Sequence, residues 1–497
     1  MAFVLIGFMG AGKSTVAAKL AIARGLVALD SDALLEQRSG RPIAREFELS
    51  GETSFRAGEE TLVCELLRDA DPHDVIALGG GSVLSERVRE ALSAHLVVLL
   101  DVDLAAAWER VGAAHNGAER PLARDPETFA ALYAERRSLY EELADAVLLW
   151  ASPPSGQYPV LVGRGLLRHA DEDKLAALWP LRRSWSRRFL VSDETVSALY
   201  ADRLGEVSGT IAIPPGEPHK TLACAERVWR ELAACGMTRS DHVVALGGGV
   251  VGDLAGFCAA TYQRGVPVIH VPTTLVAQVD SAYGGKTGVD LPDAKNYVGA
   301  YHQPAGVLVD PDLLATLPAP ELAAGWVEVL KTALIAGAGL WERVCAAAGC
   351  EVDERTILDC ARAKLAIINA DERDSGRRQA LNLGHTVGHA IETVTGYARY
   401  RHGEAVGLGL LAALRLSGAD ALREQVRELL RRRDLPVVLD GVDADVEQIL
   451  AATARDKKRL GTGAVPFVLV HAPGEVEIGC KVAESDLRAA VRELISP

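Results

Sequence analysis

Short runs of apolar residues alternate with amphipathic stretches over the first part of the chain. Residues 2–6, AFVLI, form one such run, and a glycine-rich loop and the helical pattern VAAKLAIARGL follow it. The run LVVLL at 96–100 is of the same kind. Buried strands of a parallel sheet read as uninterrupted apolar runs, and stretches with helical period between them predict covering helices. The pattern therefore predicts an α/β fold with a parallel sheet.

The pattern changes twice further along the chain. ASPPSG at 151–156 is small, contains prolines and lacks charge, which predicts a linker. Strand-like runs then return, and from about residue 316 the sequence is mainly helical until PFVLVHAPGEVEIG near the end. We therefore expect an α/β domain at 1–150, a linker at 151–156, a second α/β domain at 157–315 and a mainly α-helical domain at 316–497.

Composition narrows the class of protein. A chain of 497 residues holds about two to four domains. A net charge of -14 argues against a nucleic-acid or anionic-membrane partner, because no overall positive field attracts phosphates. The 8 cysteines form no C-x-x-C pair, which suits reduced thiols. With no cationic leader and no apolar run of about 18 residues, we expect a soluble cytoplasmic protein.

The first candidate site is the loop GFMGAGKST at 7–15, which matches G-x-x-x-x-G-K-[ST] between a predicted strand and a predicted helix. In such a loop, backbone N–H groups wrap phosphates, a lysine reaches the outer phosphates and a hydroxyl binds Mg²⁺. The alternative is a glycine-rich turn without a ligand. The residues concerned are Gly10, Ala11, Gly12, Lys13, Ser14 and Thr15.

Two glycine-rich stretches lie in the second predicted domain. In HVVALGGGVVGDL a strand runs into Gly247–Gly249, and a helix is expected to begin around Val251. A helix N-terminus behind a glycine turn can seat a pyrophosphate, although a purely structural turn remains the alternative. The next block concentrates fixed polar groups, Asp280, Lys286, Lys295 and Asn296, among glycines, which a core strand would not tolerate without ligands.

A third candidate site lies in LNLGHTVGHAIETVTGYARYRHGE at 381–404. His385 and His389 are spaced i, i+4 and share one face of a helix, and His402 follows thirteen residues after His389. Neutral imidazoles on rigid elements suit a divalent metal, while histidines that only form hydrogen bonds are the alternative. HTVGH lacks the glutamate of H-E-x-x-H, which argues against a metalloprotease.

Residues 1–150 resemble shikimate kinase. After the phosphate loop come LDSD at 29–32, GETSFR, VIALGGGSV at 75–83, GAAHNGAERPLA and ERRSLYEELAD, in that order. The resemblance implies a P-loop fold that uses ATP with Mg²⁺, with Lys13 and Arg120 catalytic, Ser14 on the metal assisted by Asp30, and Arg110 against adenine. It implies that shikimate is held by Asp32, Arg56, Gly79, Gly80, Gly81 and Arg136.

The chain from residue 157 onward closely resembles 3-dehydroquinate synthase, which implies a Rossmann-like NAD-binding α/β domain and a helical metal-binding domain. One departure is DSAYGG, where the family more often has DSS, an aliphatic residue and GG. NAD would be bound by Asp193, Thr195, Glu217, Lys220, Gly248, Gly249, Val250, Asp253, Thr273, Thr274, Lys286 and Lys295.

The same resemblance assigns the metal and the substrate. Glu328, His385 and His402 would hold Zn²⁺ or Co²⁺, which leaves His389 for proton transfer. The other catalytic side chains implied are Asp280, Lys286 and Asn296. The substrate would be bound by Lys295, Asn296, Lys331, Lys364, Arg378, Asn382, Lys457 and Lys458, together with Arg264 from the neighbouring subunit of a homodimer.

These resemblances imply a bifunctional enzyme of aromatic precursor synthesis. One part would phosphorylate shikimate, and the other would convert 3-deoxy-D-arabino-heptulosonate 7-phosphate into 3-dehydroquinate and phosphate. Two alternatives stay open. Residues 157–497 could be another sugar-phosphate cyclase or a metal-dependent alcohol dehydrogenase, and residues 1–150 could be a nucleotide-binding module without turnover.

Overall fold

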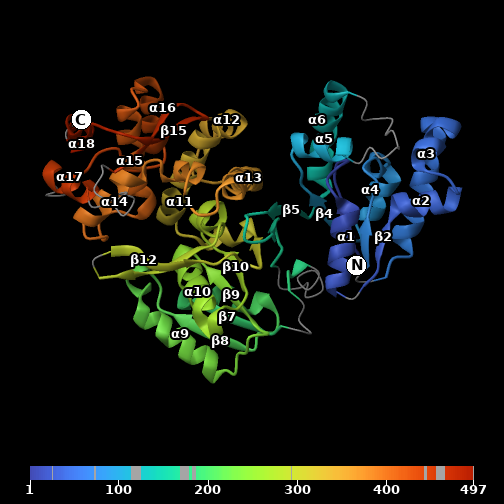
Figure 1. The fold of residues 1–497 in the computed structure, drawn as a ribbon, viewed down its shortest axis with the longest axis horizontal. Helices are drawn as coiled ribbons and strands as arrows, with labels where there is room; N and C mark the ends of the chain where they lie inside the picture. Colours follow the sequence, from blue (N-terminus) through green and yellow to red (C-terminus); the bar gives the residue numbers. More distant parts are fainter. Residues whose placement is uncertain are drawn as a thin grey trace. The chain divides into compact units, whose positions relative to one another are not determined.

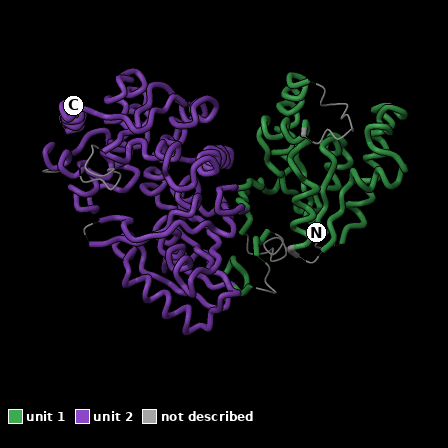
Figure 2. The backbone as a smooth tube through the Cα atoms, viewed as in Figure 1, with its two compact units in different colours: residues 1–150, 159–187, 202–206 green, residues 151–158, 188–201, 207–497 purple. Residues whose placement is uncertain are grey.

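The computed structural model describes residues 1–24, 26–71, 74–113, 125–167, 178–181, 186–292, 294–440, 445–454 and 465–495 (Figure 1). The chain divides into two compact units, shown in green and purple in Figure 2. The first consists of Met1–Trp150, Pro159–Arg187 and Asp202–Glu206, and the second of Ala151–Tyr158, Arg188–Ala201 and Val207–Pro497.

The first unit contains parallel strands in the order β2, β3, β1, β4, β5. The two apolar runs of the sequence form β1 (Phe3–Ile6) and β4 (Leu96–Leu100), and every residue of both is buried. The other three are β2 (Ala28–Asp30), β3 (Val75–Ala77) and β5 (Ala146–Ala151). The helices are α1 (Lys13–Arg24), α2 (Ser31–Ser39), α3 (Ile43–Arg68), α4 (Glu86–Leu92), α5 (Leu104–Ala113) and α6 (Pro126–Leu143).

Local chemistry sets several of these helix boundaries. Asp30 caps α2 by accepting hydrogen bonds from the backbone N–H groups of Asp32 and Ala33. Asp125 caps α6 in the same way, with a proline in the first turn. Inside α3, Gly51 has φ 74° and kinks the helix. GETSFR, which has no distinct pattern in the sequence, begins at this kink.

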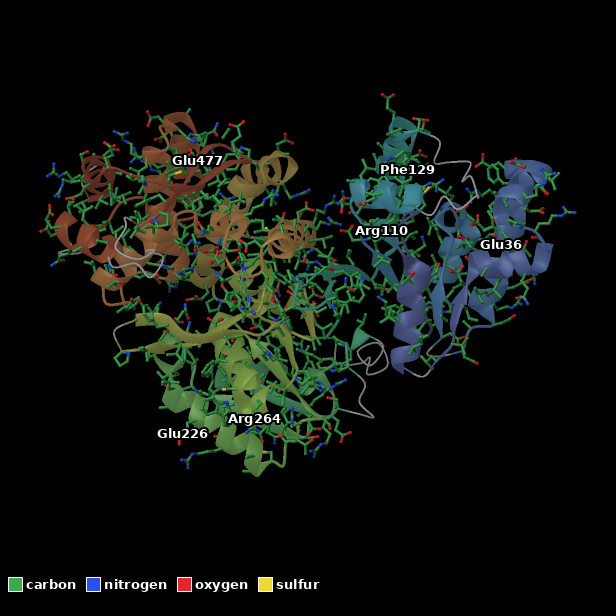
Figure 3. All side chains as sticks on the ribbon, in the orientation of Figure 1. Glu36, Arg110, Phe129, Glu226, Arg264 and Glu477 are labelled. Atoms are coloured by element: carbon green, nitrogen blue, oxygen red, sulfur yellow. The ribbon has the colours of Figure 1, made fainter. Side chains whose placement is uncertain are left out.

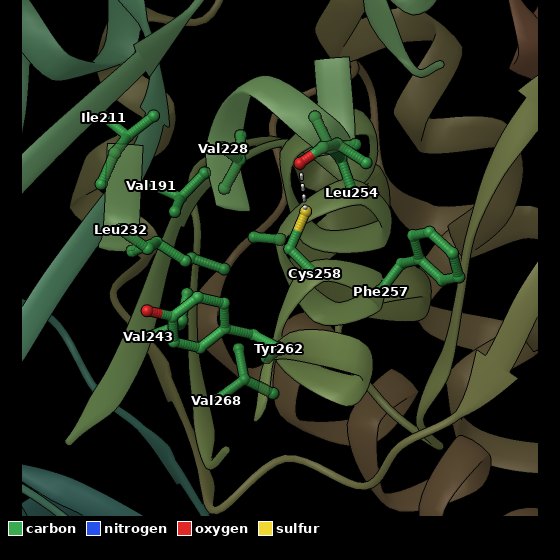
Figure 4. Close-up of a cluster of buried hydrophobic side chains, with 14 of the residues drawn as sticks. Val191, Ile211, Val228, Leu232, Val243, Leu254, Phe257, Cys258, Tyr262 and Val268 are labelled. Carbon is green, nitrogen blue, oxygen red and sulfur yellow. Dashed lines mark hydrogen bonds between the residues drawn. The ribbon is translucent and has the colours of Figure 1, made fainter. Parts of the chain in front are cut away.

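The second unit also contains a parallel sheet, with strands in the order β13, β10, β9, β7, β8. Their bounds are β7 (Arg188–Asp193), β8 (Gly209–Ile213), β9 (His242–Gly247), β10 (Val268–Pro272) and β13 (Gly306–Val309). A buried cluster between this sheet and helices α9 (Leu222–Ala234) and α10 (Gly249–Thr261) forms a core, in which Cys258 Sγ contacts the Ala225 carbonyl (Figure 4). Helix α8 (Glu194–Tyr200) follows β7. Strand β6 (Tyr158–Val162) comes before β7 in the chain, and all of it except Tyr158 belongs to the first unit.

An antiparallel hairpin, β11 (Lys286–Leu291) and β12 (Ala294–Tyr301), stands apart from this sheet and packs on α10 (Figure 1). The rest of the unit is mainly helical, as expected from residue 316 onward. It comprises α11 (Ala319–Ala336), α12 (Ala338–Ala346), α13 (Glu354–Ala370), α14 (His385–Val394), α15 (His402–Leu416), α16 (Asp420–Arg431), α17 (Val446–Ala454), the hairpin β14 (Phe467–Ala472) and β15 (Glu475–Cys480), and α18 (Glu484–Ile495).

The segment 151–158, which includes the linker that the sequence predicts at 151–156, is hydrogen-bonded within the second unit. The Ser155 backbone N–H donates to Glu372 Oε2 at 3.0 Å, and its hydroxyl donates to the other carboxylate oxygen. The Gly284 N–H donates to the Tyr158 hydroxyl oxygen at 3.1 Å. This segment is therefore fixed to loops far along the chain.

The predicted fold class is confirmed, since parallel strands alternate with helices in both units and a helical part follows. Helix α10 begins at Gly249, two residues before the apolar pattern places it, because the glycine turn itself supplies the first helical residue. Over the described ranges, no helix has the length and apolar character that a membrane span requires.

Candidate active sites

The loop between β1 and α1 has the backbone of a phosphate cradle. Gly7, Gly10 and Gly12 have φ of 145°, 80° and 89°, values that side chains other than glycine rarely adopt. The Lys13 ammonium donates to the carbonyl oxygens of Gly7 at 2.8 Å and Phe8 at 3.1 Å. A cation and the N-terminus of α1 are thus concentrated where phosphates would bind.

Other side chains around this loop are placed where they could contact a nucleotide. Ser14 and Thr15 occupy the first turn of α1. Arg110, at the end of α5 (Figure 3), points its Nη1 toward the carbonyl oxygens of Gly10 and Ala11, at 3.3 and 3.4 Å. Its guanidinium therefore lies beside the loop, where a purine could stack on it.

A second group of predicted residues surrounds the glycines after β3. A Cβ at Gly79 would lie 2.4 Å from Asp32 Oδ1, and one at Gly81 would lie 2.0 Å from Arg56 Nη1. Only glycine allows this approach, so the triple glycine brings a carboxylate and a guanidinium to one place. Such a pair recognises hydroxyl and carboxylate groups of a small ligand.

Arg136 and Tyr140 on α6 also contact the triple glycine. Both point at the Gly80 carbonyl oxygen, Arg136 Nη1 at 3.5 Å and the Tyr140 hydroxyl at 2.5 Å. Burial raises the pKa of Tyr140 to about 12, so it remains a neutral donor. The predicted lid residue Arg120 lies outside the described residues.

The sequence interpretation missed Glu59, which is buried beside Arg56 and the triple glycine. Its carboxylate accepts from the Ser82 hydroxyl at 3.0 Å and from Arg56 Nη1 at 2.6 Å. Glu59 is three residues after Arg56 on α3, so the two share a helix face. That spacing is the signal that could have identified it.

The second unit contains a cavity of about 1530 Å³ between the carboxyl ends of its strands and its helices. It brings together nearly all residues predicted for this part of the chain. Those lining it are Asp193, Thr195, Glu217, Lys220, Gly248, Gly249, Val250, Asp253, Thr273, Thr274, Asp280, Lys286, Lys295, Asn296, Lys331, Lys364, Arg378, Asn382, His385, His389 and His402.

One end of the cavity fits a dinucleotide. Helix α10 begins there at Gly249, with free N–H groups at its first turn. A Cβ at Gly248 would lie 2.8 Å from Thr274 Cγ2, so the backbone passes close to this threonine. The buried hydroxyl of Thr273 has no hydrogen-bond partner among the described residues. A buried polar atom without a partner is expected to form a hydrogen bond to a bound ligand.

A buried lysine stands beside this end. Lys220 Nζ lies 3.0 Å from Glu217, 3.2 Å from Asp253 and 3.8 Å from Asp290. Burial acts to lower the pKa of Lys220, but the carboxylates outweigh it and raise that pKa above its ordinary value. The sequence interpretation did not include Asp290, which also accepts from the Asn296 N–H at 2.7 Å.

The central part of the cavity holds paired charges. Asp280 lies on a single π-helical turn, Ala277–Ser281, a feature frequent at functional sites. Lys364 Nζ is 2.6 Å from Asp280 Oδ1, and Lys331 Nζ is 3.8 Å from Oδ2. At the hairpin, Lys286 pairs with Asp374 at 2.5 Å. Anionic groups of a ligand would meet several cations here.

Glu328 on α11, His385 on α14 and His402 on α15 converge on one point. Glu328 is 0% exposed, and its Oε1 has no hydrogen-bond partner among the described residues. Its distances to the imidazole Nε2 atoms are 3.8 Å for His385 and 3.5 Å for His402. Ligand atoms bound at 2.0–2.1 Å around a tetrahedral ion lie about 3.3 Å apart, so the set fits a small divalent metal.

The electrostatics of these three residues favour a cation between them. Burial acts to raise the pKa of Glu328, but Lys331 and His402 hold it far below its ordinary value. Burial acts to lower the pKa of His402, yet Glu328 and Glu392 raise it to about 10. Positive charge at this point is therefore strongly stabilised, as a metal site requires.

Arg378 is 1% exposed and is held by backbone oxygens. Its Nη2 donates to Gly284 O at 2.9 Å, and its Nη1 donates to Glu372 O.

Arg264 is not among the described lining residues; it is exposed beyond α10, with φ 70° (Figure 3). Lys457 and Lys458 lie outside the described residues.

Comparisons with known proteins identify related families for both parts of the chain. The shikimate kinase family model matches residues 9–157, and the 3-dehydroquinate synthase N-terminal and C-terminal models match 210–324 and 325–459. A 3-dehydroquinate synthase of Halorhodospira halophila is 46% identical over 362 residues, covering 70% of this chain and 99% of its own. One of Symbiobacterium thermophilum is 40% identical over 360 residues, covering 68% and 98%.

A solved structure is also similar. It is a 2-epi-5-epi-valiolone synthase of Streptomyces hygroscopicus subsp. jinggangensis 5008 with NAD⁺ and Zn²⁺ bound. It is 26% identical, with a TM-score of 0.59, and the alignment covers 68% of this chain and 96% of that one.

Proposed function

The chain belongs to the 3-dehydroquinate synthase family and carries a shikimate kinase region at residues 9–157, and from this premise we propose how its side chains serve two reactions. It phosphorylates shikimate with ATP, and it converts 3-deoxy-D-arabino-heptulosonate 7-phosphate into 3-dehydroquinate and phosphate. We propose the domains 1–150, 157–315 and 316–497 for the kinase, the NAD-binding part and the metal-binding part.

In the kinase, Mg²⁺–ATP supplies the phosphoryl group. The N–H groups of the loop and the Lys13 ammonium neutralise the phosphates, and Ser14 offers a metal ligand. Asp32 holds the acceptor hydroxyl, while Arg56 and Arg136 pair with the shikimate carboxylate. Phosphoryl transfer depends mainly on positioning and charge neutralisation, and these side chains provide both.

In the synthase, bound NAD⁺ supplies a reversible hydride acceptor, and Zn²⁺ or Co²⁺ supplies a Lewis acid that acidifies a substrate hydroxyl. Glu328, His385 and His402 would hold the ion. The N-terminus of α10 and the Thr273 hydroxyl would hold the cofactor. These assignments are supported by the unpartnered buried oxygens at both places.

The substrate carries a carboxylate and a phosphate, and buried cationic side chains of the cavity would pair with these anions. Lys331, Lys364 and Arg378 provide positive charge around the reacting carbons, and Lys286 lies at the mouth. His389 lines the same cavity and would move the proton that accompanies phosphate elimination. We also propose that Arg264 of a second copy completes the site in a homodimer, which its exposed position supports.

One observation supports the synthase proposal: two residues of the metal triad, His385 and His402, line the same cavity as the cation cluster and the dinucleotide-binding end, and the buried carboxylate of Glu328 faces both imidazoles. A metal-dependent alcohol dehydrogenase of similar fold needs a metal and a dinucleotide but no such set of phosphate-binding cations. It would also change the redox state of NAD, whereas the synthase returns its cofactor unchanged. Product analysis with limiting NAD⁺ separates these two.

A paired assay of the full chain tests both activities. Lys13→Met should lower the kinase kcat about 10²–10³-fold or more, because a charge that stabilises the transition state is lost, and should leave the synthase unchanged. Glu328→Gln, or chelation of the metal, should do the reverse. Steady-state rates of shikimate phosphorylation and of phosphate release measure the two.

Matched controls make the same substitutions at exposed residues, Lys19→Met on α1 and Glu342→Gln on α12. Both should leave both activities intact. Loss of the two activities together in a folded Lys13→Met chain would contradict separate sites. Absence of shikimate phosphorylation in the unmodified chain with Mg²⁺ present would refute the kinase.

A further inference from the structure

Helix α14 carries a buried carboxylate for which the functions above have no role. Glu392 is seven residues after His385 and three after His389, so all three side chains share one helix face. It is 2% exposed, and its Oε2 has no hydrogen-bond partner among the described residues. A buried carboxylate of this kind normally serves a neighbouring cation or donor.

The neighbour of Glu392 is a proposed metal ligand. His402 Nδ1 lies 3.5 Å from Glu392 Oε1, while Nε2 of the same ring lies 3.5 Å from Glu328 Oε1. His385 has the same arrangement, because its Nδ1 lies 3.1 Å from the Leu383 carbonyl oxygen and its Nε2 faces Glu328. In each imidazole, Nδ1 thus faces an acceptor oxygen and Nε2 faces the Glu328 carboxylate.

Glu392 is held in turn by the hairpin. Lys295 Nζ lies 3.3 Å from the same Oε1 and 4.5 Å from the centre of the Tyr397 ring. Tyr397 has φ 57° in the turn after α14, and its N–H donates to the Glu392 carbonyl at 2.8 Å. A left-handed tyrosine costs backbone energy, which fits a position kept for its contacts.

We propose that Glu392 is a positioning residue that keeps His402 in its metal-binding orientation, an inference that rests on the metal site proposed above. An acceptor at Nδ1 fixes the proton on that nitrogen, leaves the Nε2 lone pair facing Glu328 and raises the basicity of the ligand. Lys295 keeps the carboxylate facing the ring. The hairpin that bears the cofactor-binding lysine therefore also supports the metal site.

Another arrangement uses the same atoms. His389, Glu392 and His402 also offer ligand atoms within 4.8 Å of one another, which would make Glu392 itself a ligand. The facing atoms distinguish the two. Glu328 Oε1 is the oxygen that the Nε2 atoms of both His385 and His402 face, at 3.8 and 3.5 Å. Glu392 Oε1 instead faces the Nδ1 of His402 and the Lys295 ammonium, at 3.5 and 3.3 Å. The carboxylate on which two imidazoles converge is that of Glu328.

The test is a Co²⁺ titration of the metal-free full-length chain against a competing chelator, followed by visible absorption. Glu392→Gln keeps a weaker acceptor, and Glu392→Met removes it at similar volume. Loss of an outer-shell partner should weaken Co²⁺ binding about 10- to 100-fold, more for Met than for Gln, with the coordination number unchanged in the spectrum. Thermal unfolding of the metal-free variants checks that they fold.

Glu404→Gln is the matched control. It removes a carboxylate two residues after His402, and glutamine can still form the capping box with Arg401, so Co²⁺ affinity should stay within about 2-fold. Unchanged affinity in both Glu392 variants would overturn the proposal. So would complete loss in them with retention in Glu328→Gln, which would make Glu392 a ligand. A failure of the unmodified chain to bind Co²⁺ would instead refute the proposed metal site.

Discussion

Burial of a charged side chain in the cavity costs free energy, and the pKa of Lys364 shows this effect. Burial lowers the pKa of Lys364 to about 8 against the attraction of Asp280, with Lys331 adding to the lowering. The ordinary value is 10.5. Of the two buried lysines beside Asp280, Lys364 is therefore the one that loses its proton near physiological pH, since the pKa of Lys331 is raised.

We predict that kcat/KM of the synthase falls as pH rises above about 8. Loss of the Lys364 proton removes a cation that the doubly anionic substrate needs, and kcat/KM reports the pKa of the free enzyme. Steady-state rates from about pH 6 to 10 measure it, since this range extends to both sides of the lowered pKa of about 8.

Stability should respond in the opposite direction. Because the folded-state pKa of Lys364 is below the unfolded value, the unfolded chain binds more protons between about pH 8 and 10.5, so this residue makes stability rise there. Urea unfolding at each pH separates the two effects. A flat kcat/KM, or a decline that follows unfolding, would contradict the assignment.

Among single residues, the polar block at 280–296 and the spacing of His385 and His389 were visible in the sequence, and the resemblance to 3-dehydroquinate synthase supplied the other lysines and arginines that line the cavity. Glu392, Asp290 and Asp374 were not predicted. Acidic residues are frequent on any surface, and only the fold shows that these three face a histidine or a lysine. Glu392 lies three residues after His389, a spacing that a helix-face reading could have used.

Among the elements, α15 approaches its neighbours unusually closely at glycines. A Cβ at Gly403 would lie 1.8 Å from the Ala324 carbonyl oxygen on α11, and one at Gly409 would lie 1.9 Å from the carbonyl oxygen of Gly384, the residue before His385. These close approaches set the distances among the three helices that bring Glu328, His385 and His402 together.

We predict that Gly403→Ala weakens Co²⁺ binding and lowers stability by about 1–3 kcal/mol or more, because α15 must move away from α11. Gly407→Ala is the control on the same helix, where the nearest atom to a Cβ would be 3.4 Å away on a leucine side chain. Metal titration and thermal unfolding measure both. Equal behaviour of the two variants would contradict a role for close helix packing.

The main elements were predictable where period and length agree, as in β1, β4 and the helices after residue 316. Others were not. The π turn at Asp280 and the turn at Gly396–Tyr397 are local departures that tertiary contacts enforce, so hydrophobic periodicity gives no sign of them. Both departures lie at the candidate site.

In the whole molecule, residues 151–158 belong to the second unit and are part of its structure. Besides the contacts of Ser155 and Tyr158, the Ser152 N–H donates to Asn369 Oδ1 at 2.6 Å. Tyr158 and Ser155 contact Gly284 and Glu372, the two residues whose backbone oxygens accept hydrogen bonds from Arg378. The composition of ASPPSG indicates only a break in the pattern and gives no sign of partners over 200 residues away.

We predict that a chain beginning at Ala151 forms a more stable synthase than one beginning at Pro159. The shorter chain leaves the buried Gly284 N–H without the Tyr158 hydroxyl, at about 1–3 kcal/mol. It also removes both Ser155 hydrogen bonds from the Glu372 carboxylate, which retains the one from Gln303. Urea unfolding and synthase rates compare the two. Tyr158→Phe in the full-length chain isolates the Gly284 contribution, and equal stability of all forms would contradict the prediction.

The same hydrogen bonds also determine when residues 151–158 can fold during synthesis of the chain. Strands β1 to β5 pair with one another within the first 151 residues, so this sheet can form while the rest of the chain is still being synthesised. Ser152 and Ser155 bond to residues 217 positions later. At 5–20 residues per second, they wait about 10–40 s for these partners to emerge from the ribosome. The segment that follows the kinase is thus made early and reaches these contacts only after the chain has been synthesised to residue 372.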